Sequence, residues 1–434
     1  MKGLIFTYGL TYCGAGAALV NPFVGILIYV CFAIVKPEHL WTWSVPTGNY
    51  SRLVVIATLL GWSFKSFGVW KLGKARAMCV LLVCLLLWSI LSTSVASNKD
   101  VAWSFVDKLS KIVLPYVVGI TLIQTTWQIK QLAWVISLSY GYLALEFNRL
   151  YYSGQFIRGA FTFAGMEEGS IAIGMICASG FTFFYALYQT NLWKKVILFL
   201  CTAFTGHVVL FSFSRGGILG LLTMVVVAFA VVKKDARSLF AIILVMILGV
   251  RMAGVEVRDR LATMFVSQQQ RDASSQSRLD LWSACWETML ENPILGIGGD
   301  QWTVDGVQKY EGKIALFSER KEAHTLWLQI GAELGVPGLF MIVMFYVLCM
   351  VRLWPYRRLI QTEGGFAGHL ANQADRWTSY AACMVIVPLS GFMVSAQFIS
   401  LEFLEVPYYL VLLGSGILKL HPVSSLSHSP ASIA

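Results

Sequence analysis

Charged side chains are scarce in this chain. Asp, Glu, Lys and Arg together make up 13% of its 434 residues, whereas ordinary globular domains carry roughly 25%. Hydrophobic residues make up 57% of the chain. This composition is typical of a protein that lies within a lipid bilayer, and it argues against a conventional water-soluble domain.

Several motifs of other protein classes are also missing. No Cys/His cluster has the spacing of a metal site, and Glu167 and Glu168, being adjacent, would diverge by roughly 100° on a helix. The glycine-rich stretch "NPILGIGGDQW" is not followed by Gly-Lys-Ser/Thr, which argues against a phosphate loop. The cysteines offer no disulfide framework to the extramembrane segments. No small-residue cleavage site follows a short apolar core, so we expect no removable signal peptide.

Long apolar runs recur instead from one end of the chain to the other. Runs of about 20 residues are long enough to cross roughly 30 Å of hydrocarbon as helices, and the ~10-residue alternating segments of a membrane barrel are absent. We therefore predict an all-α, polytopic transmembrane helical bundle of about 12 spans (12 or 13). The candidate spans are 51–68, 75–95, 108–124, 127–147, 169–190, 193–213, 216–232, 237–253, 335–354, 377–398 and 403–420. Residues 1–35, broken by Pro22, form either one bent span or a helical hairpin.

Basic residues in the short loops predict the orientation of these spans. They lie in alternate loops, at Lys71, Lys74, Arg76, Lys130, Lys194, Lys195, Lys233, Lys234, Arg237, Arg352, Arg357 and Arg358. These loops are assigned to the cytoplasm, which also explains most of the net charge of +10 without nucleic acid as a partner. The other loops are then outside, although the lysines of 96–111 fit this assignment least well.

The domain organisation follows from the same pattern. We expect N-terminal transmembrane helices over 1–253, an outer segment over 254–334 packed on the bundle, C-terminal transmembrane helices over 335–420 and a disordered tail over 421–434. The outer segment includes "SSQSRLDLWSACWETMLENP", which reads as an amphipathic helix with Leu279, Trp282, Trp286 and Met289 on its apolar side. A cap at Ser275 or Ser277 would place Arg278 in its first turn.

The sequence "FSFSRGGILG" at 211–220 places an arginine between two apolar spans. Snorkelling to lipid headgroups would explain Arg215 alone. It does not explain Gly216 and Gly217, which would let the backbone turn and come close to a ligand. Arg149 and Arg158 are assigned to the same outer face, although basic residues usually lie in the cytoplasmic loops. We interpret these residues as a site for a phosphate-bearing ligand at the outer boundary.

Two further residues are candidates for this site. Arg278 at a helix start would bind an anion together with free backbone amides, the alternative being a surface ion pair with Asp280. His324 begins a short helical stretch over about 322–334 and is the natural group for proton transfer near neutral pH. A hydrogen-bonded structural role is the alternative for His324. For the intramembrane His207, the alternative is packing or a hydrogen bond to a neighbouring helix.

Three motifs in this order resemble the O-antigen ligase superfamily. They are "FSFSRGG" after a span, "SRLDLW…ENPILGIGG" in a long outer loop and "AHTLWLQIGAELGVPGL" leading into the next span. The specific part of the resemblance covers about residues 205–345. The stretch "NPFVGILIYVCFAIVKPEHLW" is also similar to O-glycosylation ligases found beside exosortase systems.

The resemblance implies a glycosyltransferase of the bacterial inner membrane. Its activity would be transfer of a glycan from undecaprenyl diphosphate to a lipid A–core hydroxyl at a periplasmic active site, with membrane lipids as surroundings and no cofactor or metal. The family's arginines match Arg215 and Arg278, and its histidine matches His324. Thr325 stands where members often have asparagine, so that residue's role does not carry over.

The catalytic scheme expected from these residues is a single, inverting displacement. His324 would deprotonate the acceptor, since Glu319 or Glu322 beside arginines would be a weaker base. Arginines would neutralise the leaving diphosphate in place of a divalent cation. The alternatives within the superfamily are an O-antigen polymerase and a protein O-oligosaccharyltransferase. An organic-anion transporter is the alternative from another class, and it would need a polar path to the membrane midplane.

Overall fold

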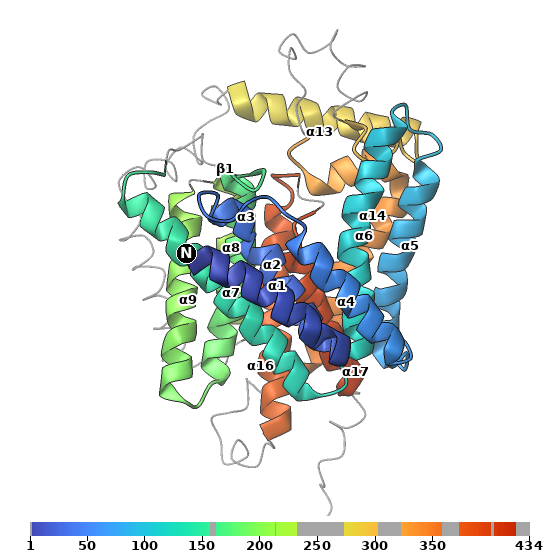
Figure 1. Cartoon of the computed structure of the whole chain (residues 1–434). Coiled ribbons are helices and arrows are strands. Elements are labelled where there is room, and N and C mark those ends of the chain that lie inside the picture. Colours follow the sequence, from blue (N-terminus) through green and yellow to red (C-terminus); the bar gives the residue numbers. More distant parts are fainter. Residues whose placement is uncertain are drawn as a thin grey trace, which may run out of the picture.

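In a computed structural model of the chain, helices account for most of the residues described, which are 2–156, 162–212, 214–231, 273–302, 323–357, 373–400 and 403–421 (Figure 1). The helices are α1 (Lys2–Val20), α2 (Pro22–Val35), α3 (Pro37–Leu40), α4 (Tyr50–Phe64), η1 (Gly73–Ala75), α5 (Arg76–Ser92), α6 (Lys99–Leu122), α7 (Thr126–Tyr152), α8 (Glu168–Tyr188), α9 (Leu192–Phe211), α10 (Arg215–Val231), α13 (Ala273–Glu291), α14 (Leu326–Leu353), η5 (Trp354–Arg357), α16 (Gln373–Ser395) and α17 (Val406–Leu420). Strands β1 (Thr162–Phe163) and β2 (Met166–Glu167) form an antiparallel pair. The all-α class is thereby confirmed.

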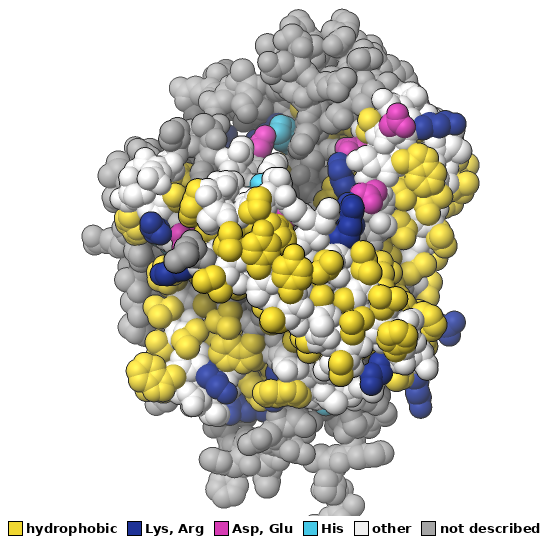
Figure 2. All heavy atoms as spheres, in the orientation of Figure 1, with side chains coloured by type: hydrophobic (Ala, Val, Ile, Leu, Met, Phe, Trp, Pro, Cys, Tyr) yellow, Lys and Arg dark blue, Asp and Glu magenta, His cyan; other side chains and the backbone are white. Residues whose placement is uncertain are grey.

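Seven helical stretches within the described residues are long and apolar enough to cross a membrane, and α4, α10 and α17 are shorter apolar helices. Most predicted spans coincide with one of the helices, whereas the predicted span 237–253 lies outside the described residues. The apolar stretches of α8 and α16 are 83% buried, but that of α1 is only 28% buried. Helices α8 and α16 therefore form the centre of the bundle, and Figure 2 shows hydrophobic side chains over much of its flank.

The first two helices form a hairpin, which resolves the alternatives for residues 1–35. Asn21 caps α2 through its side chain, and Pro22 occupies the first turn, where its missing N–H costs nothing. A Cβ atom at Gly14 would meet Ile28, and one at Gly25 would meet Ala18, so the two helices pack antiparallel. The small residues let the helices approach closely.

Loops with basic residues meet at one end of the bundle, which we call the inner end. Lys130 donates a hydrogen bond to the Tyr188 hydroxyl at 3.0 Å, and Arg352 donates to the Lys74 carbonyl. Lys419 donates to the Ile120 carbonyl at 2.7 Å. These contacts join loops that the charge pattern assigned to one side of the membrane. The opposite end, which we call the outer end, carries residues 93–98, 153–156, 162–168, 292–302, 323–325 and 396–400.

Helix α13 lies across the outer end and packs against α14 (Figure 1). The predicted amphipathic helix is confirmed, but its predicted cap and apolar face need correction. The helix begins at Ala273, so Ser275 and Ser277 lie inside it. Leu279 and Trp286 are exposed. The buried residues of the helix are instead Leu281, Ala284, Cys285, Thr288 and Met289. That set follows the spacing of one helical face.

Helix α14 joins the predicted short outer stretch to the following span across a kink. Gly335 lies there with φ 71°, and a Cβ atom at this position would be 2.2 Å from the Ile294 carbonyl oxygen. The amide of Val336 donates to the Pro293 carbonyl at 2.9 Å. Glycine is therefore required both by the backbone conformation and by the close approach of the 292–302 loop.

Candidate functional site

Arg215 is the first residue of α10, at the outer end of the bundle. The amide of Gly217 donates to the Ser214 hydroxyl at 3.1 Å, and the amide of Ile218 donates to the Ser214 carbonyl at 2.9 Å. Ser214 therefore caps the helix, as serine commonly does. The cap fixes where α10 begins and places the guanidinium in its first turn.

The glycines after Arg215 lie against neighbouring helices. The Gly216 carbonyl accepts a hydrogen bond from the Ser395 hydroxyl at 3.1 Å, and a Cβ atom at Gly216 would lie 2.8 Å from the Phe398 Cβ. A Cβ atom at Gly217 would lie 3.3 Å from the Ala172 Cβ. Close packing of α10 on α8 and on the end of α16 thus accounts for both glycines. Their role in the approach of a ligand stays a prediction.

The turn after α16, which we call the 395–398 turn, contacts three separate segments. Ser395 binds the start of α10 as described, and the Ala396 carbonyl accepts a hydrogen bond from the Leu326 amide at 2.9 Å. The ring centroids of Trp282 and Phe398 are 6.0 Å apart, which joins α13 to the same turn. The segments that carry Arg215, Arg278 and His324 are therefore all held against this one turn.

Arg278 lies near Arg215 but not at a helix start. It is the sixth residue of α13, so the predicted first-turn position is wrong and the terminal amides of α13 are not beside it. Burial lowers the pKa of Arg278, and the positive charge of Arg215 lowers it further, whereas the carboxylate of Glu167 raises it. Two arginines on separate helices thus share one electrostatic environment with one carboxylate, and an anion there would relieve their repulsion.

His324 precedes α14 on the same outer surface. Its φ of 51° lies in the left-handed region, which is uncommon for a residue other than glycine. Such conformations concentrate at functional sites. Its neighbour Thr325 is fully buried, and the Thr325 hydroxyl has no hydrogen-bond partner in the part of the chain that the structure describes.

A buried carboxylate holds the adjoining 292–302 loop in place. Glu333 is fully buried in α14, and its side chain accepts hydrogen bonds from the amide of Asp300 at 2.9 Å and from the amide of Trp302 at 3.3 Å. Gln329 also donates to it, at 3.2 Å. Because buried polar groups need hydrogen-bond partners, these bonds anchor the loop to α14.

The remaining predicted site residues are less central. Arg149 lies in the last turn of α7, where it pairs with Glu146 at 3.6 Å and its side chain is 78% exposed. Arg158, Glu319 and Glu322 lie outside the described residues. His207 Nδ1 lies 2.5 Å from the side-chain oxygen of Asn148 in α7, and the ring packs among aromatic side chains. Both contacts fit the structural alternative for this residue, which is packing or a hydrogen bond to a neighbouring helix.

Two residues near the site were not singled out from the sequence. Glu167 had been considered only as a metal ligand, and its proximity to Arg278 depends on how α8 meets α13. Glu333 resembles any other polar position of an apolar helix, so no sequence signal marked it. Within the described ranges, no group of three or more His, Cys, Asp and Glu side chains is arranged to hold a metal ion.

Comparison with known families places this site within one matched region. Residues 200–343 match a family model described as O-antigen ligase, and residues 1–148 match a model described as a family of unknown function. No curated protein matches the chain. The first match contains Arg215, Arg278 and His324, and it confirms the resemblance drawn from the three sequence motifs.

Proposed function

We propose, from the premise that the chain carries an O-antigen ligase domain, that it is a multi-pass glycosyltransferase. In this proposal the donor is a glycan linked to undecaprenyl diphosphate, and the acceptor is a hydroxyl of lipid A–core. The site lies at the outer end of the bundle, which would face the periplasm of a bacterial inner membrane.

The observation that supports this proposal most is the convergence at the 395–398 turn. It brings the segments of Arg215, Arg278 and His324 together at one end of the bundle, and the two guanidiniums act on each other electrostatically. Guanidinium groups bind phosphate oxygens through paired hydrogen bonds, so two of them suit a diphosphate leaving group. A lipid-linked donor can reach such a site because its chain remains in the bilayer.

The reaction would proceed as one displacement. His324 accepts the proton of the acceptor hydroxyl, and the hydroxyl oxygen forms a bond to the anomeric carbon as the bond to the diphosphate breaks. The electron pair leaves with the diphosphate, whose charge Arg215 and Arg278 neutralise. The configuration at the anomeric carbon is inverted, and no covalent glycosyl-enzyme forms.

The transporter alternative has less support. The charged residues of the central helices α8 and α16 lie only at their first residues, at Glu168, Asp375 and Arg376. The rest of each helix beyond its first turn is apolar or hydroxyl-bearing. A substrate path to the midplane would need polar groups along such helices. The charged residues of the candidate site lie instead at the ends of helices, where a boundary site is expected.

The test is a transfer assay with the purified chain in lipid nanodiscs. It would supply an undecaprenyl-diphosphate glycan and, in separate reactions, lipid A–core, a second lipid-linked glycan or a Ser/Thr peptide. Glycosylated lipid A–core in the presence of EDTA would support the ligase. Product only on the lipid-linked glycan or only on the peptide would replace it with the polymerase or the protein-glycosylating alternative. No product on any acceptor, with a donor that a known ligase uses in parallel, would contradict the proposal.

A further inference from the structure

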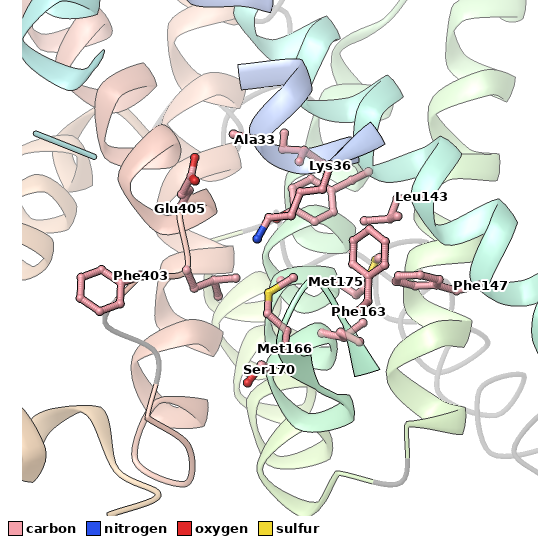
Figure 3. Close-up of a pocket in the computed structure, with 15 residues that line it drawn as sticks. Ala33, Lys36, Leu143, Phe147, Phe163, Met166, Ser170, Met175, Phe403 and Glu405 are labelled. Atoms are coloured by element: carbon pink, nitrogen blue, oxygen red, sulfur yellow. The ribbon is translucent and has the colours of Figure 1, made fainter. Parts of the chain in front are cut away.

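A cavity with mostly apolar walls lies beside the candidate site (Figure 3). Its empty space, counted together with the open solvent at its mouth, is about 460 Å³. Its walls come from α2, α7, the β1–β2 pair, α8 and the start of α17. The wall residues include Ile34, Leu143, Phe147, Phe163, Met175 and Leu404. Such walls suit a hydrocarbon chain and offer few partners to the many hydroxyls of a sugar.

Lys36 supplies a cation to this cavity. It lies between α2 and α3 with φ 44°, and Figure 3 shows its amine pointing into the cavity. Among the described residues, no hydrogen bond from this amine and no carboxylate within 4.0 Å of it is present. The other charged wall residue, Glu405, accepts a hydrogen bond from the Tyr409 hydroxyl. Glu405 and Lys36 also act on each other electrostatically, so the ammonium has a carboxylate near it but makes no direct ion pair or hydrogen bond with the described residues. Its N–H donors are therefore available to a ligand in the cavity.

The cavity and the candidate site lie on two sides of the same turn. Met166 and Ser170 line the cavity, and Glu167, between them, is the carboxylate whose charge acts on Arg278. On the side facing the site, a Cβ atom at Gly169 would lie 3.7 Å from the Ser214 hydroxyl, next to Arg215. A ligand in the cavity is thus separated from the two arginines by one turn of chain.

We propose that this cavity binds the phosphate of an anionic lipid, with Lys36 contacting a phosphate oxygen and the first part of the lipid chain lying along the apolar wall. This inference rests on the proposed function for its biological role, because the neighbouring site is the one assigned to a lipid diphosphate. Two sources share the required chemistry. One is a polyprenyl phosphate, and the other is an anionic phospholipid of the bilayer.

The experiment measures lipid binding to the full chain by native mass spectrometry. The probes are undecaprenyl phosphate, phosphatidylglycerol and, as an uncharged-head baseline, phosphatidylcholine. Loss of one charge-assisted hydrogen bond predicts a decrease in affinity of roughly tenfold to a hundredfold for Lys36→Gln. Lys36→Arg keeps the charge and retains binding, and Lys99→Gln, an exposed lysine of the same end of the bundle, leaves it unchanged. If Lys36→Gln weakens binding of undecaprenyl phosphate alone, the ligand is a polyprenyl phosphate. If it weakens binding of both anionic lipids, the cavity is a general site for lipid phosphates.

A second variant tests the cavity without altering charge. A Cβ atom at Gly174, on the cavity wall, would have its nearest neighbours at 3.4 and 3.6 Å, so Gly174→Ala is expected to fold and to place a methyl group where the lipid chain lies. It should reduce binding of the anionic lipid several-fold. Wild-type binding by folded Lys36→Gln or by Gly174→Ala overturns the proposal.

These outcomes are separable from those of the transfer assay, because the binding probes carry no glycan. Lys36-dependent binding without transfer to any acceptor supports the cavity and contradicts the proposed function. Transfer by the wild type together with normal lipid binding by Lys36→Gln contradicts the cavity alone.

Discussion

At Arg278, the sequence and the structure support the same assignment for different physical reasons. The sequence argument relied on a helix start, whose free amides would join the guanidinium in binding an anion. In the structure the residue lies further along α13, and its environment is set by burial, Arg215 and Glu167. A helix boundary is a local property, whereas the charges around a side chain come from other segments.

The two arginines give the first prediction at this scale. Arg215→Lys and Arg278→Lys should each lower the rate of transfer by roughly 30-fold to 1,000-fold, equivalent to about 2–4 kcal/mol of transition-state stabilisation. Lysine keeps the charge but loses the paired hydrogen bonds to phosphate. The measurement is kcat/KM for the donor, with Arg52→Lys, an exposed arginine of α4, as the matched control. Full activity in both variants would favour snorkelling to lipid headgroups instead.

His324 gives the second prediction. General base catalysis typically contributes about 10²–10⁴-fold, so His324→Ala should lower kcat by that factor with little change in donor KM. The control is His39→Ala, which removes an exposed histidine of α3. NMR of the product should show inversion at the anomeric carbon. A retained configuration would require two displacements, and near-wild-type turnover of His324→Ala would place the base elsewhere.

At the scale of elements, the start of α10 depends on close packing. Gly216 lies against Phe398 and accepts a hydrogen bond from Ser395, and Gly220 further along α10 lies against the Gly391 carbonyl oxygen. These small residues form one seam between α10 and α16. The seam determines where Arg215 stands relative to the 395–398 turn, so helix packing and site geometry are coupled here.

A pair of glycine substitutions tests this coupling. Gly216→Ala should destabilise the protein by about 1–3 kcal/mol, because its methyl group would overlap with Phe398. Gly206→Ala in α9, where nothing lies within 4 Å of the added atom, should leave stability unchanged or improve it slightly. Thermal unfolding in the same detergent measures both. Equal melting temperatures for the two variants would show that the seam tolerates movement.

At the scale of the whole molecule, topology decides whether the proposed chemistry is feasible. The inner end gathers the loops with Lys130, Lys194 and Arg352, which the charge pattern assigns to the cytoplasm. The outer end gathers α13, the 292–302 loop and the candidate site. A donor presented in the periplasm can reach the site only if this orientation holds.

Cysteine labelling in intact cells tests the orientation. Ser283→Cys, exposed on α13, should react with a membrane-impermeant maleimide from the periplasmic side, and so should Ser153→Cys after α7. Lys194→Cys, exposed at the start of α9, should react only after the cells are lysed. If Ser283→Cys reacted only after lysis, the outer end would face the cytoplasm. A periplasmic transfer reaction could not then occur at this site.

Much of the fold was predictable because membrane spans leave a strong local signal. Lipid contact requires apolar residues over the length of a span, so the ends of α5, α8, α9 and α16 could be located to within about four residues. The apolar face of α13 was predicted less well. Trp282 was placed correctly, but Leu279 and Trp286 were not, since an aromatic or aliphatic residue at a membrane boundary need not face the protein core.

The sequence by itself determined the membrane class, the alternation of the loops and the three motifs that match the O-antigen ligase model, because these depend on residue type and local spacing. Only the tertiary structure decided that Gly216 packs on Phe398, that Glu167 lies near the arginines and that Lys36 points into a cavity. Hydropathy reports whether a helix lies in the bilayer, but not which helix it touches. Contacts between distant segments depend on the shapes and small residues of both partners, and those are satisfied together only when the whole bundle is packed.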